Sequence, residues 1–148
     1  MSRRALFVLL AALRGIAPAH GAMPPSCSIS GTGLNFGLYR ATNGPVAFTA
    51  DIHVQCFGGP ATFTVALTGG SSGNPRMRQM RASDGTVLRY QLYLDAARTR
   101  PWGDEAQGGI AGPLTSAAAT LTVYGLVFGG QHVPAGQMID TVQAILSY

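Results

Sequence analysis

Residues 47–56 read Ala-Phe-Thr-Ala-Asp-Ile-His-Val-Gln-Cys, and this stretch decides the fold class. Apolar residues occupy every second position and alternate with polar ones; the apolar set is Phe48, Ala50, Ile52, Val54 and Cys56. A period of two places one row of side chains in a core and the other row in solvent. The stretch therefore predicts a half-buried β-strand whose inner face includes Cys56.

Similar alternation recurs further along the chain. It predicts strands over residues 62–68, 88–94, 120–124 and 140–148, separated by Gly-, Ser- and Pro-containing turns. No window shows a helical repeat, and the composition of 148 residues with 20 glycines and 11% charged residues fits neither a helical bundle nor a disordered chain. About six or seven short strands predict one all-β sandwich without a second domain.

The N-terminal residues 1–22 have the pattern of a secretory signal peptide. Arg3 and Arg4 precede the apolar run 5–13, and small residues follow, with cleavage expected between Ala19 and Ala22. The alternative is a membrane anchor, but the apolar run is too short to span a bilayer. Residues 23–148 are then the mature domain, and the protein is expected to be exported to the periplasm and the cell surface.

Loss of this leader would change the charge balance. The whole chain has 10 basic and 6 acidic residues, a net charge of +4. Arg3, Arg4 and Arg14 leave with the leader, so 7 basic residues remain against 6 acidic ones, a net charge of +1. Nucleic-acid binding is therefore not expected, because it depends on a basic surface.

The two cysteines, Cys27 and Cys56, both lie in the expected mature domain. An even cysteine count in an exported chain favours a disulfide, with two buried free thiols as the alternative. A bridge closing a loop of about 30 residues stabilises a domain by roughly 3–4 kcal/mol in the chain-entropy model. There is no Cys-x-x-Cys pair, so a redox or zinc site is not expected.

No catalytic or metal site is expected. Residues 69–73, Gly-Gly-Ser-Ser-Gly, match the pattern of a nucleophile elbow, but no helical segment follows them. His53 and His132 have no second ligand at metal-binding spacing, and the acidic residues are scattered. We therefore expect no enzyme activity, no cofactor and no small-molecule substrate.

Arg76, Arg78, Arg81 and Arg89 form a local basic cluster. It could bind an anionic ligand or the acidic patch of a partner. We favour a solvated hairpin edge, where charge discourages aggregation.

A longer signature lies in residues 90–104, which read Tyr-Gln-Leu-Tyr-Leu-Asp-Ala-Ala-Arg-Thr-Arg-Pro-Trp-Gly-Asp. It resembles the central signature of the spore coat protein U domain family, which also contains subunits of archaic chaperone–usher pili. Further matching pieces are Cys27 to Gly37, Val54-Gln55-Cys56, Arg78-Gln79-Met80, Thr122-Val123-Tyr124-Gly125, Val133-Pro134-Ala135-Gly136 and Asp140 to Tyr148. Each piece is weak alone, but their common order makes the resemblance specific.

The resemblance implies an immunoglobulin-like β-sandwich that lacks its last strand. A periplasmic chaperone would fill the resulting groove first, and other pilus subunits would replace it at an outer-membrane usher. The closing strand 140–148 is the expected groove edge, because both of its faces contain apolar residues. The candidate groove residues are Val142, Ala144, Leu146 and Tyr148.

The leading hypothesis is thus a structural subunit of an archaic chaperone–usher pilus. Two alternatives remain: a secreted coat or matrix protein of the same domain type, and a surface-binding tip module. Only residues 23–26, Met-Pro-Pro-Ser, would precede Cys27 after cleavage. Prolines cannot donate ladder hydrogen bonds, so the chain is expected to accept a partner strand without donating one, at a fibre terminus or outside a polymer.

Overall fold

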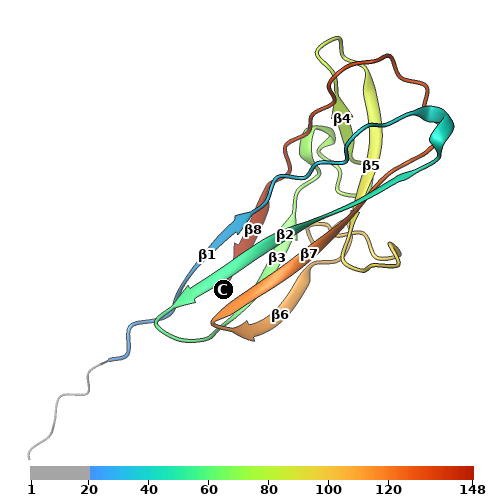
Figure 1. Cartoon of the computed structure of the whole chain (residues 1–148). Coiled ribbons are helices and arrows are strands. Elements are labelled where there is room, and N and C mark those ends of the chain that lie inside the picture. The colour runs from blue at the N-terminus through green and yellow to red at the C-terminus, as the bar shows by residue number, and fades with distance from the viewer. Residues whose placement is uncertain (1–20) are drawn as a thin grey trace, which may run out of the picture.

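The computed structural model describes residues 21–148, which form an all-β sandwich (Figure 1). The expected signal peptide falls mostly on residues 1–20, outside the described part, and stays a prediction. The strands are β1 (Ser26–Gly31), β2 (Val46–Phe57), β3 (Ala61–Leu67), β4 (Gln79–Arg81), β5 (Val87–Tyr93), β6 (Ala111–Ser116), β7 (Ala118–Val127) and β8 (Ala144–Ser147). Two short 3-10 turns, η1 (Ala41–Asn43) and η2 (Gly70–Ser72), complete the regular structure.

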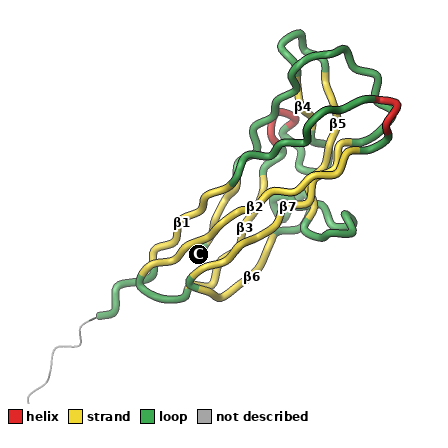
Figure 2. The backbone as a smooth tube through the Cα atoms, viewed as in Figure 1, coloured by secondary structure: helices red, strands yellow, loops and turns green. Residues whose placement is uncertain are grey.

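The strands form two antiparallel sheets. One has five strands in the order β1-β2-β7-β5-β4, and the other has three in the order β6-β3-β8. Long irregular segments gather at the end of the sandwich near β4 and β5, where Figure 2 shows mostly loop. Within residues 21–148, no helix is long and apolar enough to cross a membrane.

The stretch that decided the fold class forms β2, as predicted. Ile52, Val54 and Cys56 are buried, whereas His53 and Gln55 between them are exposed. The strand pairs with β1 on one side and with β7 on the other. Its alternation therefore places one face on the core while its backbone is paired on both sides.

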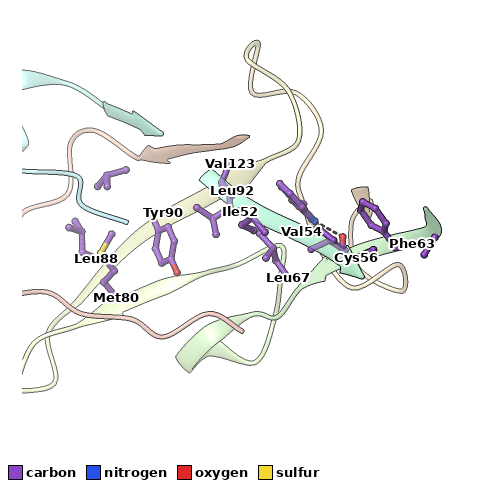
Figure 3. Close-up of a cluster of buried hydrophobic side chains, with 14 residues drawn as sticks. Ile52, Val54, Cys56, Phe63, Leu67, Met80, Leu88, Tyr90, Leu92 and Val123 are labelled. Carbon is purple, nitrogen blue, oxygen red and sulfur yellow. Dashed lines mark hydrogen bonds between the residues drawn. The ribbon is translucent and has the colours of Figure 1, made fainter. Parts of the chain in front are cut away.

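The core lies between the two sheets. Phe63 and Val65 of β3 meet Leu92 and Val127 of the larger sheet, and all four are almost fully buried. Figure 3 shows Met80, Leu88 and Tyr90 at one end of this core and Cys56 and Phe63 at the other. The alternation expected for residues 88–94 is incomplete, because Gln91 and Tyr93 are buried as well.

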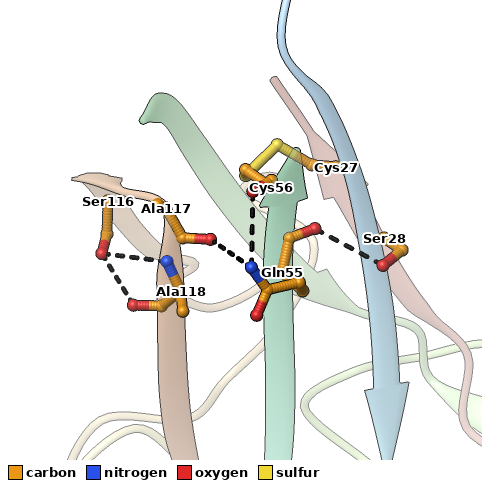
Figure 4. The surroundings of a disulfide bond; sticks show 7 residues. All are labelled: Cys27, Ser28, Gln55, Cys56, Ser116, Ala117 and Ala118. Atoms are coloured by element: carbon orange, nitrogen blue, oxygen red, sulfur yellow. Dashed lines mark hydrogen bonds between the residues drawn. A yellow bond between two sulfur atoms is a disulfide. The ribbon is translucent and has the colours of Figure 1, made fainter. Parts of the chain in front are cut away.

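A disulfide joins Cys27 to Cys56, as Figure 4 shows. The two residues are direct cross-strand partners in the antiparallel β1–β2 pair. Because β1 is an edge strand paired only with β2, the bridge fastens it at this end of the sandwich. The inward position of Cys56 agrees with the alternation of β2.

The closing strand is shorter than predicted. The expected strand covered residues 140–148, but only Ala144–Ser147 form β8. The carboxylate of Asp140 accepts hydrogen bonds from the Tyr90 hydroxyl at 2.6 Å and from the Ser71 backbone N–H at 2.7 Å. These bonds hold the chain at Asp140 away from the β3 ladder, which it joins only at Ala144.

Candidate partner-strand groove

The two sheets are open along one side of the sandwich. Strand β1 is an edge of the larger sheet, and β8 is an edge of the smaller one. The two strands lie side by side, with no ladder between them in the described part of the chain (Figure 1). Each edge presents a row of backbone groups that another strand could pair with.

A cavity of about 1260 Å³ continues from this open side; we call it the groove. Its first wall is the segment 32–41, which follows β1, and its second wall is the segment 133–142, which leads into β8. Its floor consists of side chains from β2, β4 and β5, which are Phe48, Met80, Leu88 and Tyr90. Segments about a hundred residues apart in sequence thus face each other across an apolar floor.

The backbone of both walls is largely unpaired. Within the described residues, neither 33–39 nor 133–138 makes a backbone–backbone hydrogen bond. The second wall is first tied down at Ile139, which exchanges two backbone hydrogen bonds with Arg81 at 2.8 and 3.0 Å. Unpaired backbone groups need water or another strand as a partner.

Large apolar side chains lie exposed along the walls. Leu38 is 74% exposed and Ile139 is 57% exposed, and both line the groove. Ile145 of β8 and Tyr148 beyond it are also exposed. Exposed apolar side chains beside unpaired backbone favour binding of an extended, apolar strand.

The four residues expected at the groove edge occupy different environments. Val142 lines the groove, and Val142, Ala144 and Leu146 are half-buried against the core. Tyr148 lies past the end of β8 and is 60% exposed. Their role in binding a partner strand stays a prediction.

The wall 32–41 was missed in the sequence. Leu34, Phe36 and Leu38 alternate with polar residues or glycine there, which is a strand-like pattern. In the structure, this segment forms no strand within the described chain, although Phe36 packs against Phe48 with ring centroids 6.1 Å apart. The alternation was the signal that could have marked this segment as strand-like, whereas its lack of a strand partner is visible only in the structure.

The basic cluster is solvated only in part. Arg76, Arg81 and Arg89 are exposed, as expected, but the expectation is wrong for Arg78, which is fully buried. The Arg78 guanidinium donates to the backbone carbonyls of Leu67, Thr68, Pro75 and Trp102 and to the side-chain oxygen of Gln91, at 2.7–3.0 Å. Burial lowers the pKa of Arg78 to about 10, so it stays charged at neutral pH.

Arg78 gathers the residues of the sequence signature into one network. Gln91 accepts from Arg78 at 2.7 Å and from the Leu92 backbone N–H at 2.8 Å. The Trp102 indole N–H donates to the Val65 carbonyl at 2.8 Å, which ties the signature to β3. The signature is thus structural, and it positions β4 and β5, whose side chains form the groove floor.

Tyr90 and Asp140 connect the floor of the groove to its second wall. The hydroxyl of Tyr90 donates to Asp140, and burial, with the nearby carboxylate, raises the pKa of Tyr90 above its ordinary range. Asp140 lies against Gly70, where a Cβ would collide with its carboxylate. The positive φ of Gly70, 62°, also favours glycine at this position.

The nucleophile-elbow pattern lies in a plain turn. Ser71 and Ser72 lie in η2, and their hydroxyls donate to the backbone carbonyls of Gln79 and Gly69 at 2.8 and 2.9 Å. Both hydroxyls therefore stabilise the loop. Across residues 21–148, no group of three or more His, Cys, Asp or Glu side chains could hold a metal ion.

Comparisons with known proteins agree with this architecture. "Protein U" of Myxococcus xanthus is 31% identical over 143 residues, covering 83% of this chain and 78% of that protein. The fold is similar to a chain in the crystal structure of the CsuC–CsuE chaperone–tip adhesion subunit pre-assembly complex, from archaic chaperone–usher Csu pili of Acinetobacter baumannii. That likeness has a TM-score of 0.55 at 21% identity and covers 84% of this chain but only 40% of the other.

The all-β sandwich and the family resemblance expected from the sequence are both confirmed. Residues 17–145 match the sequence model of the Spore Coat Protein U domain. This chain therefore belongs to the spore coat protein U domain family.

Proposed function

We propose that this protein is a structural subunit of a chaperone–usher type of pilus and that it accepts a partner's β-strand in the groove. The groove carries this proposal, because both of its walls present unpaired backbone above an apolar floor. In strand addition, main-chain hydrogen bonds supply affinity, and pockets for alternate side chains supply specificity. The groove has the chemistry for both contributions.

The proposed partners follow from this assembly. A periplasmic chaperone would donate the first strand after export, and the outer-membrane usher would exchange it for a segment of another pilus subunit at the cell surface. The family and fold support a chaperone and other subunits as partners. Filling the groove would pair the open backbone and cover Leu38 and Ile139, which are exposed in the chain alone.

A secreted coat protein is the second candidate function. It is favoured by the family's description and by the 31% identity to Protein U of Myxococcus xanthus. In that case, the same groove would be filled within a coat and not within a fibre. Genes for a chaperone and an usher beside the gene for this protein would favour the pilus.

Photo-cross-linking can test the groove directly. A photoreactive amino acid at Leu38, which lines the groove and is 74% exposed, should cross-link to a co-expressed chaperone from the same genome. The same amino acid at Met77, which is 61% exposed outside the groove, is the matched control and should give no cross-link. Equal yields from both positions, measured by mass spectrometry, would contradict strand binding in the groove.

The residues before β1 suit an acceptor of strands better than a donor. Pro24 and Pro25 lie there and have no backbone N–H to donate to a ladder. With the cleavage expected between Ala19 and Ala22, we propose that the mature chain cannot extend a fibre through its own N-terminus. Incubation of the purified chaperone complex should therefore give no ladder of this chain in unheated SDS gels; a ladder would overturn the acceptor-only role.

A further inference from the structure

Beyond Thr32, the described part of the first wall has one polar attachment outside its own loop. The Tyr39 hydroxyl accepts from the Gln131 backbone N–H at 2.8 Å and donates to the Gln131 carbonyl at 3.2 Å. Within the described chain, these are the only hydrogen bonds that join residues 33–41 to anything beyond residue 43. The wall is otherwise tied at Thr32, whose backbone N–H donates to the Asp51 carbonyl at 3.0 Å.

Gln131 is itself fixed firmly to the larger sheet. Its side-chain oxygen accepts from the Arg89 backbone N–H at 2.8 Å, and its side-chain nitrogen donates to the Arg89 carbonyl at 2.9 Å. The same nitrogen donates to the Phe128 carbonyl at 2.8 Å. Gln131 therefore continues the β5–β7 pairing with its side chain while its backbone holds Tyr39.

We propose that Tyr39 is a positioning residue that fixes the first wall at the rim of the groove, with Phe36 on the floor and Leu38 exposed, so that a partner strand can enter. This inference rests on the proposed function. Leu34, Phe36 and Leu38 are apolar and have no strand beside them, and the floor beneath is apolar. Phe36 already packs on Phe48, and without the Tyr39 hydroxyl, burial of the exposed Leu34 and Leu38 would favour a wall folded further over the floor.

An equilibrium between a wall held at the rim (the open form) and a wall folded over the floor (the closed form) has separate effects on the rates of strand binding and release. Only the open form binds a strand, so the association rate falls with the open fraction. Once seated, the strand pairs with the wall and holds it open, so the dissociation rate depends little on Tyr39. A general loss of stability would not separate the two rates in this way.

The test mixes the fraction of the purified chain that stays soluble with an extended, fluorescent synthetic peptide of about ten residues, the number in each wall, in which valine alternates with threonine. For Tyr39→Phe, the association rate should fall roughly three- to tenfold, which is the factor that corresponds to the free energy of about one net hydrogen bond. The dissociation rate should change little. Tyr124→Phe is the matched control, because the Tyr124 hydroxyl makes no hydrogen bond within residues 21–148 and the residue lies between two inward-facing positions of β7. Gln131→Met should reproduce the slower association by releasing the anchor of Tyr39.

The outcomes separate the two proposals. No binding of the peptide by the wild-type chain contradicts the strand-accepting groove, and the role of Tyr39 falls with it. Binding by the wild type with unchanged association rates for Tyr39→Phe and Gln131→Met overturns the role of Tyr39 alone. If Tyr39→Phe does not fold, the rate measured for Gln131→Met decides.

Discussion

Replacing Arg78 with methionine should lower the free energy of unfolding by about 3–5 kcal/mol, enough to unfold a marginally stable domain. The substitution removes the donors to three buried carbonyl groups and to the half-buried carbonyl of Thr68, and it removes one of the two donors to the Gln91 side-chain oxygen. Each buried acceptor left without a donor costs about 1–3 kcal/mol. The substitution also removes the cost of burying the charged guanidinium, which offsets part of the cost of the unpaired acceptors. The expected loss of stability is therefore smaller than the sum over those acceptors.

Two further variants make this measurement specific. Arg76→Met removes an exposed arginine two residues away and should change the free energy of unfolding by no more than about 0.5 kcal/mol. Arg78→Lys keeps the positive charge but replaces the planar guanidinium, which has five N–H donors, with an ammonium group that has three. It should therefore still destabilise the domain substantially. Urea unfolding of the chain with its groove filled by a saturating strand peptide without tryptophan, monitored through Trp102 fluorescence, provides the readout, because this indole lies within the network. Equal midpoints for Arg78→Met and Arg76→Met would show that the buried network contributes little.

Without a partner strand, most of the exported chain should be recovered as insoluble material, and co-expression of its chaperone should bring it into the soluble fraction. The reason is the open groove, with its unpaired backbone and its exposed Leu38 and Ile139. A partner present at a hundred times its Kd stabilises a folded chain by about 2.7 kcal/mol. That stabilisation raises the ratio of folded to unfolded molecules roughly a hundredfold.

Soluble yield and thermal unfolding midpoint, each with and without the chaperone, measure this effect. The control is a chaperone whose strand-donating segment has serine in place of its alternating apolar residues, which should not rescue the chain. A soluble monomer that unfolds cooperatively without any partner would argue strongly against an open groove.

Several parts of the fold could be predicted from local sequence. The alternation in residues 47–56 corresponds to β2, and similar patterns located β3, β5 and β7. The inward position of Cys56 and the ordered signature pieces were also readable, because they depend on residue spacing alone. Period-two patterning is a local property, so it is present in the sequence before any tertiary contact forms.

The sequence was a poor guide wherever tertiary contacts override the local pattern. Arg78 lies in a run of arginines that looks solvated, yet carbonyls from Leu67 and Trp102, elements distant in sequence, surround its guanidinium. The closing strand begins only at Ala144, because Tyr90 and Ser71 hold the chain at Asp140. Neither the burial of Arg78 nor the late start of β8 can be recognised from the neighbouring residues in the sequence.

The sequence by itself determined that this protein is an all-β member of the spore coat protein U domain family, and it predicted a disulfide between the two cysteines. Only the tertiary structure decided which strands are edges and where the groove lies. Its walls, 32–41 and 133–142, become neighbours through the order of strands within two sheets. Strand order depends on pairing between distant segments, and hydrophobic alternation, which records only which side of each strand faces the core, carries no information about it.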